Sequence, residues 1–176
     1  MKKNELGKSG LQVSELALGT MTFGAETDEG EAWRQLDAFV AAGGNFIDTA
    51  NKYTNGTSER FLGEFMASDR ERIVLATKYT NTAPGNDPNA GGNQRKNMMQ
   101  SVEASLKRLK TDYIDLYWLH VWDFTTPVEE VMRAFDDLVR QGKVLYIGIS
   151  DAPAWTVARA NMLAELRGWI QFVGLQ

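Results

Sequence analysis

The chain has 176 residues, of which 43% are hydrophobic and 24% charged, a composition typical of a water-soluble globular protein of one domain. Its formal net charge of −4 gives no general reason to expect nucleic-acid binding, and the lack of cysteine excludes disulfides, thiolate zinc sites and cysteine nucleophiles. No apolar run approaches the roughly 20 residues of a membrane span, and the first residues lack the apolar core of a signal peptide, so we expect a cytoplasmic protein without a membrane partner.

The chain begins with a predicted hairpin and one strand–helix unit. Residues 4–13 contain two short strand-like pieces around Lys8-Ser9-Gly10, which predict a β-hairpin. Residues 14–20 are an apolar strand candidate that stops at Gly19-Thr20. Asp28 or a neighbour is suited to cap the next helix, whose apolar residues recur at helical spacing until Gly43-Gly44.

The same order of strand and helix repeats along the rest of the chain. The strand candidates are residues 45–50, 73–79, 114–120, 144–150 and the beginning of one more at 172–176. Helical spacing of apolar residues predicts helices after Ser58, around residues 102–109, after Pro127 and from Pro153 to Leu166. Residues 80–92, rich in Asn, Pro and Gly, form a loop long enough to suggest a functional surface.

Strands that alternate with helices predict parallel βαβ units in an α/β fold. A doubly wound sheet is the alternative, but the turn Gly19–Gly24 matches neither GxGxxG nor GxxxxGK[ST]. We therefore expect a TIM-type (β/α)8 barrel, which takes eight strands and about 250 residues when closed. The prediction for residues 1–176 is a single barrel domain truncated after its sixth strand, whose open edges favour self-association.

Polar side chains occur at the carboxyl ends of four successive strand candidates. Residues two apart on a strand share a face, so Asp48, Lys78, His120 and Ser150 should all point into one rim of the barrel. Tyr53 lies on the loop that follows the strand of Asp48. Each residue alone has a structural explanation: a cap, a solvated lysine, a half-buried aromatic ring or a hydrogen-bonded histidine. Their coincidence at one end of parallel strands favours a site.

These residue types suit the protonation of a carbonyl oxygen. A tyrosine with a pKa of about 10 is a poor acid at neutral pH, and we expect the Lys78 ammonium to lower the pKa of Tyr53. Asp48 is the expected counter-charge of Lys78, and a neutral His120 can polarise the carbonyl. His120 and Asp48 would give a metal ion only two protein ligands at this rim, so no metal is expected. The set suits carbonyl reduction, provided that a cofactor brings the hydride.

Several segments together resemble the aldo-keto reductase superfamily. They are residues 19–24 (GTMTFG), 45–53 (NFIDTANKY), 76–78 (ATK), 115–120 (DLYWLH), 142–150 (GKVLYIGIS) and the terminal Leu-Gln. The resemblance implies a (β/α)8 barrel whose bottom is plugged by the N-terminal hairpin, here residues 1–13. It also implies reduction of small-molecule aldehydes and ketones with NADPH (NADP), less often with NADH (NAD).

The resemblance assigns roles residue by residue. Tyr53 is the general acid, Lys78 and Asp48 tune it, and His120 orients the carbonyl. The implied cofactor contacts are Thr20, Met21, Asp48, Ser150, Asp151 and Gln176, and the implied substrate walls are Phe23, Tyr79 and Trp122. Asp151 stands where many relatives have Asn, so its side chain can accept from a carboxamide NH2 but cannot donate to the C=O.

Two hypotheses follow from the sequence. The first is an NAD(P)H-dependent carbonyl reductase. The second is a catalytically silent or regulatory barrel fragment that needs a partner chain or another copy to close, because the family's last two strands, which carry the adenosine and 2′-phosphate contacts, are absent from this sequence.

Overall fold

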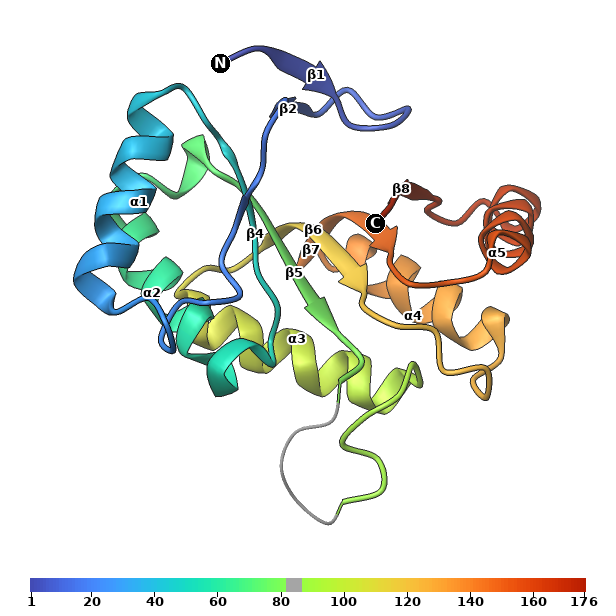
Figure 1. Ribbon diagram of the computed structural model, residues 1–176. Coiled ribbons are helices and arrows are strands. Elements are labelled where there is room, and N and C mark those ends of the chain that lie inside the picture. Colours follow the sequence, from blue (N-terminus) through green and yellow to red (C-terminus); the bar gives the residue numbers. More distant parts are fainter. Residues whose placement is uncertain (82–86) are drawn as a thin grey trace.

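A curved parallel sheet forms the centre of the computed structural model, which describes residues 1–81 and 87–176 (Figure 1). The six-stranded sheet has the order β3-β4-β5-β6-β7-β8, and every neighbouring pair is parallel. Its strands are β3 (Leu18–Gly19), β4 (Phe46–Asp48), β5 (Val74–Tyr79), β6 (Ile114–Leu119), β7 (Val144–Ile149) and β8 (Phe172–Leu175). The prediction of an α/β fold with a sequentially ordered parallel sheet, part of a (β/α)8 barrel, is confirmed.

Helices cover the outer side of this sheet (Figure 1). They are α1 (Glu29–Ala41), α2 (Thr57–Phe65), α3 (Arg95–Leu109), α4 (Val128–Arg140) and α5 (Ala154–Arg167), with short 3-10 turns η1 (Tyr53–Gly56), η2 (Met66–Ser68) and η3 (Arg70–Arg72). The Asp28 side chain accepts from Glu31 N at 2.8 Å, as predicted for the cap of α1. No helix among the described residues combines the length and the apolar character needed to cross a lipid bilayer.

The sheet has a different apolar core on each face. On the outer face, large clusters of buried residues fill the space between strands and helices. On the inner face, Ala76, Leu116 and Trp118 pack together with Phe46 from the neighbouring strand. The Trp118 ring lies so close to Gly148 that a Cβ there would be 2.2 Å from it, so this strand must present a glycine to the interior.

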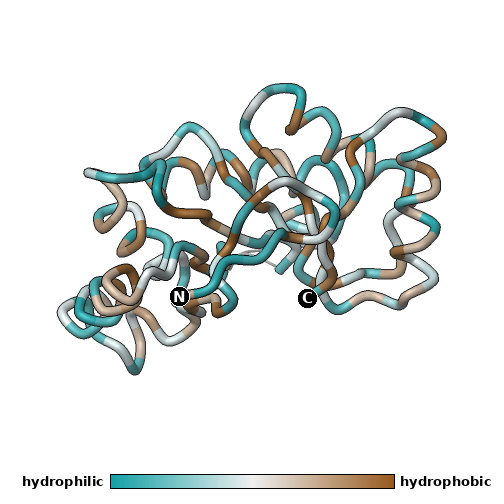
Figure 2. Tube along the Cα trace, turned by 90° about the horizontal axis from the view of Figure 1, so that it is seen from above, coloured by the Kyte–Doolittle hydropathy of each residue, from teal (hydrophilic) through white to brown (hydrophobic). Residues whose placement is uncertain are grey.

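The N-terminal hairpin, β1 (Lys3–Glu5) and β2 (Gln12–Ser14), lies at the amino ends of the strands (Figure 1), and Figure 2 views the molecule from above, the side on which the hairpin lies in Figure 1. Lys3 Nζ donates to Gly43 O at 2.6 Å and to Asn45 Oδ1 at 3.0 Å, directly before β4. Leu6 packs against the inner-face cluster. These contacts put the hairpin at the end of the interior opposite to Asp48, while its role as the plug of a closed barrel stays a prediction.

Candidate active site

The carboxyl ends of three adjacent strands deliver the polar residues of the site. Asp48 is the last residue of β4, Lys78 lies near the end of β5, and His120 directly follows β6. Tyr53 is the first residue of η1, the short turn that connects β4 to α2. Parallel neighbours end on the same side of a sheet, so this topology gathers the four side chains at one rim.

Lys78 is the centre of the cluster. Its Nζ donates to Asp48 Oδ2 at 2.5 Å, to Thr49 O at 2.8 Å and to Tyr53 OH at 3.5 Å. The Lys78 and Asp48 side chains are only 2% and 15% exposed. A buried ammonium is tolerated because a carboxylate and further acceptors compensate for the lost water.

The pKa of Tyr53 is shifted in the direction opposite to the expected one. Half-burial of the phenol, and next the Asp48 carboxylate, raise the pKa of Tyr53 above its usual value. The expectation that Lys78 lowers this pKa is wrong for this structure, because burial and the Asp48 carboxylate set its direction although the Lys78 ammonium lies 3.5 Å from the phenol oxygen. Burial also lowers the pKa of Lys78, although the Asp48 carboxylate opposes that shift. Tyr53 therefore keeps its proton at neutral pH.

His120 is held beside Tyr53 in its neutral form. Burial, and then the positive charges of Lys78 and Lys52, lower the pKa of His120 to about 4. Its ring lies edge-on to the Tyr53 ring, with centroids 6.1 Å apart. Asn81 Nδ2 lies 2.9 Å from His120 Nδ1. A neutral imidazole beside a protonated phenol can offer a second hydrogen bond to one carbonyl oxygen.

The three residues implied as substrate walls have buried side chains. Phe23 and Tyr79 are completely buried and Trp122 is 6% exposed, all within the cores between the sheet and the helices. Tyr79 follows Lys78 on β5 and so points to the opposite face, where its OH donates to Asn93 O at 3.1 Å. In this structure the three side chains pack within these cores, and their assignment as substrate walls stays a prediction.

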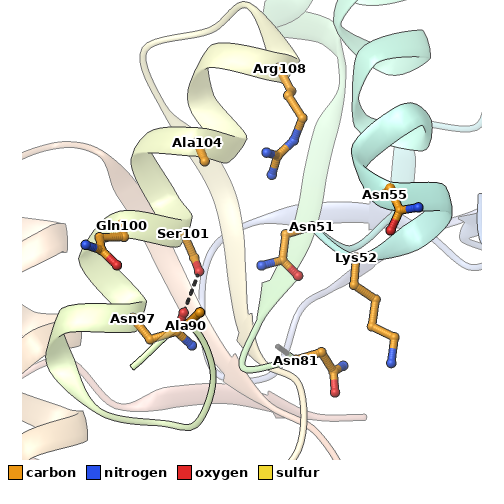
Figure 3. A pocket seen from close by; sticks show the side chains of 10 residues that line it. All are labelled: Asn51, Lys52, Asn55, Asn81, Ala90, Asn97, Gln100, Ser101, Ala104 and Arg108. Carbon is orange, nitrogen blue, oxygen red and sulfur yellow. Dashed lines mark hydrogen bonds between the residues drawn. The ribbon is translucent and has the colours of Figure 1, made fainter. Parts of the chain in front are cut away.

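A cavity that the sequence did not predict, lined mainly by residues with polar side chains, opens next to the rim. It has a volume of about 300 Å³ and lies between the segment around η1 and helix α3. Figure 3 shows the amides of Asn51 and Asn55 on one side and α3, with Arg108, on the other. Asn81 belongs both to this cavity and to the hydrogen bond with His120. The only advance signal for Asn81 was its position in the long loop of residues 80–92.

Residues 15–176 match the family model described as the Aldo/keto reductase family. This chain belongs to that family. It is 49% identical to norsolorinic acid reductase of Aspergillus flavus, over 93% of this chain and 46% of that protein. It is 44% identical to aryl-alcohol dehydrogenase [NADP(+)] of Phanerodontia chrysosporium, over 93% of this chain and 47% of that protein. With aldo-keto reductase ausK of Emericella nidulans the identity is 42%, over 93% and 45% of the two chains. The chain thus spans about half the length of these curated relatives.

The rim of this aldo/keto reductase chain also presents groups suited to a nicotinamide cofactor. Asp48 Oδ1 is buried and has no hydrogen-bond partner among the described residues. A carboxylate oxygen in this state could accept a hydrogen bond from a ribose hydroxyl of a cofactor. Gln176 Nε2 donates to Asp48 Oδ2 at 3.4 Å, and Asp151 N donates to Gln176 O at 3.2 Å. Ser150 precedes Asp151 at the end of β7. Asp48, Ser150, Asp151 and Gln176 thus lie along one edge and fit the nicotinamide half of such a cofactor.

The two implied contacts in the first loop differ from each other. Thr20 is fully buried, and its hydroxyl is hydrogen-bonded to Ser58 Oγ at 2.7 Å and to Asp48 O at 3.2 Å. The side chain of Thr20 is therefore occupied within the protein. Met21 is 65% exposed and leaves its side chain accessible.

Proposed function

We propose that this chain carries the proton-donating residues of an NADPH-dependent reductase that converts aldehydes or ketones to alcohols, with NADH as the less frequent cofactor. The single observation that carries the proposal is the contact set of Lys78, in which one buried ammonium joins the Asp48 carboxylate to the Tyr53 hydroxyl. The name of the NADP(+)-dependent aryl-alcohol dehydrogenase among the relatives supports NADP and makes aromatic aldehydes the first substrates to test.

Each residue of the cluster has a distinct task in this mechanism. Tyr53, protonated at neutral pH, donates its proton to the carbonyl oxygen as negative charge develops there. Lys78 stabilises the phenolate that remains, and Asp48 holds the ammonium in place. Neutral His120 donates a hydrogen bond to the same oxygen. Asp48, Ser150, Asp151 and Gln176 would hold a nicotinamide cofactor, which would supply the hydride for the carbonyl carbon.

The test is a pair of measurements on the 176-residue chain. NADPH binding is followed by fluorescence titration, and turnover by the loss of NADPH absorbance with 4-nitrobenzaldehyde. Tyr53→Phe should lower kcat by at least about 100-fold, the usual contribution of a general acid, and leave the NADPH dissociation constant unchanged. Tyr113→Phe is the matched control, because the Tyr113 ring packs under Arg70, away from the rim. An active chain whose rate survives Tyr53→Phe would disprove the mechanism.

A second candidate is a fragment that is silent until another copy or a partner chain closes the barrel. Within the described part of the sheet, β3 pairs only with β4 and β8 pairs only with β7. Near β8, large apolar side chains are exposed on α5 and on the strand itself: Trp155, Met162, Leu166 and Leu175. Open edges and exposed apolar surface favour association.

Sedimentation velocity at several concentrations distinguishes the two candidates. A concentration-dependent oligomer that Leu166→Lys dissociates, in a chain that consumes no NADPH with 4-nitrobenzaldehyde, would favour the silent fragment. A monomer that unfolds cooperatively and turns over the aldehyde would exclude it.

A further inference from the structure

We propose that Asn81 is a positioning residue that fixes the tautomer of His120, so that Nε2 carries the hydrogen and Nδ1 carries the lone pair. The use of that hydrogen, as a donor to the carbonyl oxygen, rests on the proposed function. The tautomer itself does not, and can be measured without substrate or cofactor.

The hydrogen bond between the two side chains determines the tautomer. Asn81 Nδ2 lies 2.9 Å from His120 Nδ1. The structure turns the Nδ2 side of the Asn81 amide toward the ring, and because an amide nitrogen has hydrogens and cannot accept, Nδ1 is the acceptor in this arrangement. In a neutral imidazole with a free lone pair on Nδ1, the hydrogen is on Nε2. With the amide in this orientation, the opposite tautomer would place two N–H groups against each other.

The backbone holds both residues in register for this contact. His120 N donates to Tyr79 O at 3.1 Å and to Thr80 Oγ1 at 3.2 Å, so His120 is tied to the end of β5. Asn81 is the second residue after Tyr79, at the same strand end that provides Lys78. The strand that holds the ammonium therefore also places the amide that orients the imidazole.

The charged groups around His120 keep its imidazole neutral, so the two neutral tautomers are the states that Asn81 has to distinguish. Lys78 from β5 and Lys52 from the segment before η1 disfavour an imidazolium, and Asp151 after β7 only partly opposes them. The Tyr53 ring lies edge-on to the imidazole and remains neutral. An ordinary hydrogen bond biases a two-state ratio by up to about tenfold, and the clash of two donors in the other tautomer increases that bias.

Nitrogen NMR on histidine-labelled chain tests the proposal directly. His120 is the single histidine of the sequence, so its two ring nitrogens give the only imidazole signals. At neutral pH we expect a pyrrole-like shift for Nε2 and a pyridine-like shift for Nδ1. In Asn81→Asp a carboxylate can only accept, so the pattern should reverse to Nδ1–H. Asn89→Asp, which adds the same charge at an exposed position of the same loop, should leave the pattern unchanged.

Kinetics give the second readout. Asn81→Asp removes the Nε2–H donor at neutral pH, so kcat should fall by about 100-fold, as for the loss of one oxyanion donor, with no change in the NADPH dissociation constant. The rate should recover at lower pH, where the imidazolium carries both hydrogens; a general structural defect would not produce this recovery.

The outcomes separate the two proposals. Pyrrole-like Nδ1 in the unmodified chain, or an unchanged pattern in Asn81→Asp, would overturn the role of Asn81, even in an active reductase that depends on Tyr53. The expected tautomer and its reversal in a chain without reductase activity would support the role of Asn81 and count against the proposed function.

Discussion

Replacing Lys78 by Met tests whether breaking the ion pair between Lys78 and Asp48 costs as much unfolding free energy as breaking a buried ion pair should. The side chain keeps its length and apolar stem but loses the ammonium that contacts Asp48 Oδ2 at 2.5 Å. The carboxylate then remains 15% exposed, with its second oxygen already lacking a partner among the described residues. Removing one member of such a pair leaves an uncompensated charge.

The expected loss is about 3–5 kcal/mol of unfolding free energy, a large fraction of the roughly 5–15 kcal/mol typical of a domain. The surface pair Arg34–Glu31, whose side chains are 71% and 45% exposed, provides the control. Arg34→Met should leave the unfolding free energy close to that of wild type, because water screens an exposed pair and solvates the remaining charge.

Urea denaturation followed by circular dichroism measures both variants at pH 7. The double variant Lys78→Met/Asp48→Asn should recover most of the loss, since it removes the stranded charge. A deficit equal to that of Arg34→Met, or no recovery in the double variant, would refute the argument.

Three further predictions concern neighbouring residues. The pKa of His120 is about 4 in the folded chain and 6.5 ordinarily. Between these two pH values the imidazole is therefore protonated in the unfolded chain and neutral in the folded chain, so folding weakens as pH falls. Wild type should lose roughly 1–2 kcal/mol relative to His120→Gln between those pH values, an estimate discounted for partial exposure, and parallel stability curves would contradict it. Gly148→Ala should destabilise by about 1–3 kcal/mol and perturb the near-UV dichroism of Trp118, whereas Gly10→Ala, with nothing within 4 Å of the added Cβ, should do neither. Burial raises the pKa of Tyr53, so the ultraviolet difference titration of wild type minus Tyr53→Phe should show a phenol that ionises above pH 10.0, and ionisation below that value would contradict the structure.

The order of strands and helices and the convergence of the polar residues were predictable from the sequence for a simple reason. Parallel strands in βαβ order must end on one side, and side chains alternate with a period of two. These two rules are enough to bring Asp48, Lys78 and His120 to one rim, and they also put Trp118 on the inner face. Neither rule depends on packing detail.

What the sequence did not predict depends on distances and on competition between interactions. The direction of the Tyr53 pKa shift follows from half-burial of the phenol and, next, from the nearby Asp48 carboxylate, and both depend on the folded environment. The role of Asn81 depends on the path of a loop with no periodic pattern. For Tyr79 the family resemblance suggested a substrate contact, although alternation with Lys78 already pointed its ring to the helix side, where it stacks on Tyr117 at 5.4 Å.

The groups of the site differ in how firmly the sheet holds them, because some belong to central strands and others follow edge strands. Asp48, Lys78 and His120 belong to strands that have hydrogen-bonded neighbours on both sides, so their mutual geometry is set by the interior of the sheet. Thr20 and Met21 follow β3, and Gln176 follows β8, the two strands with a single neighbour in the described sheet. Strands at an edge have fewer contacts that hold them and open at lower free energy. The cluster of Asp48, Lys78 and His120 should therefore keep its geometry under conditions that already loosen the strands carrying Thr20, Met21 and Gln176. Closing the barrel with further strands or with another copy would then strengthen cofactor binding more than it would change the geometry around Tyr53.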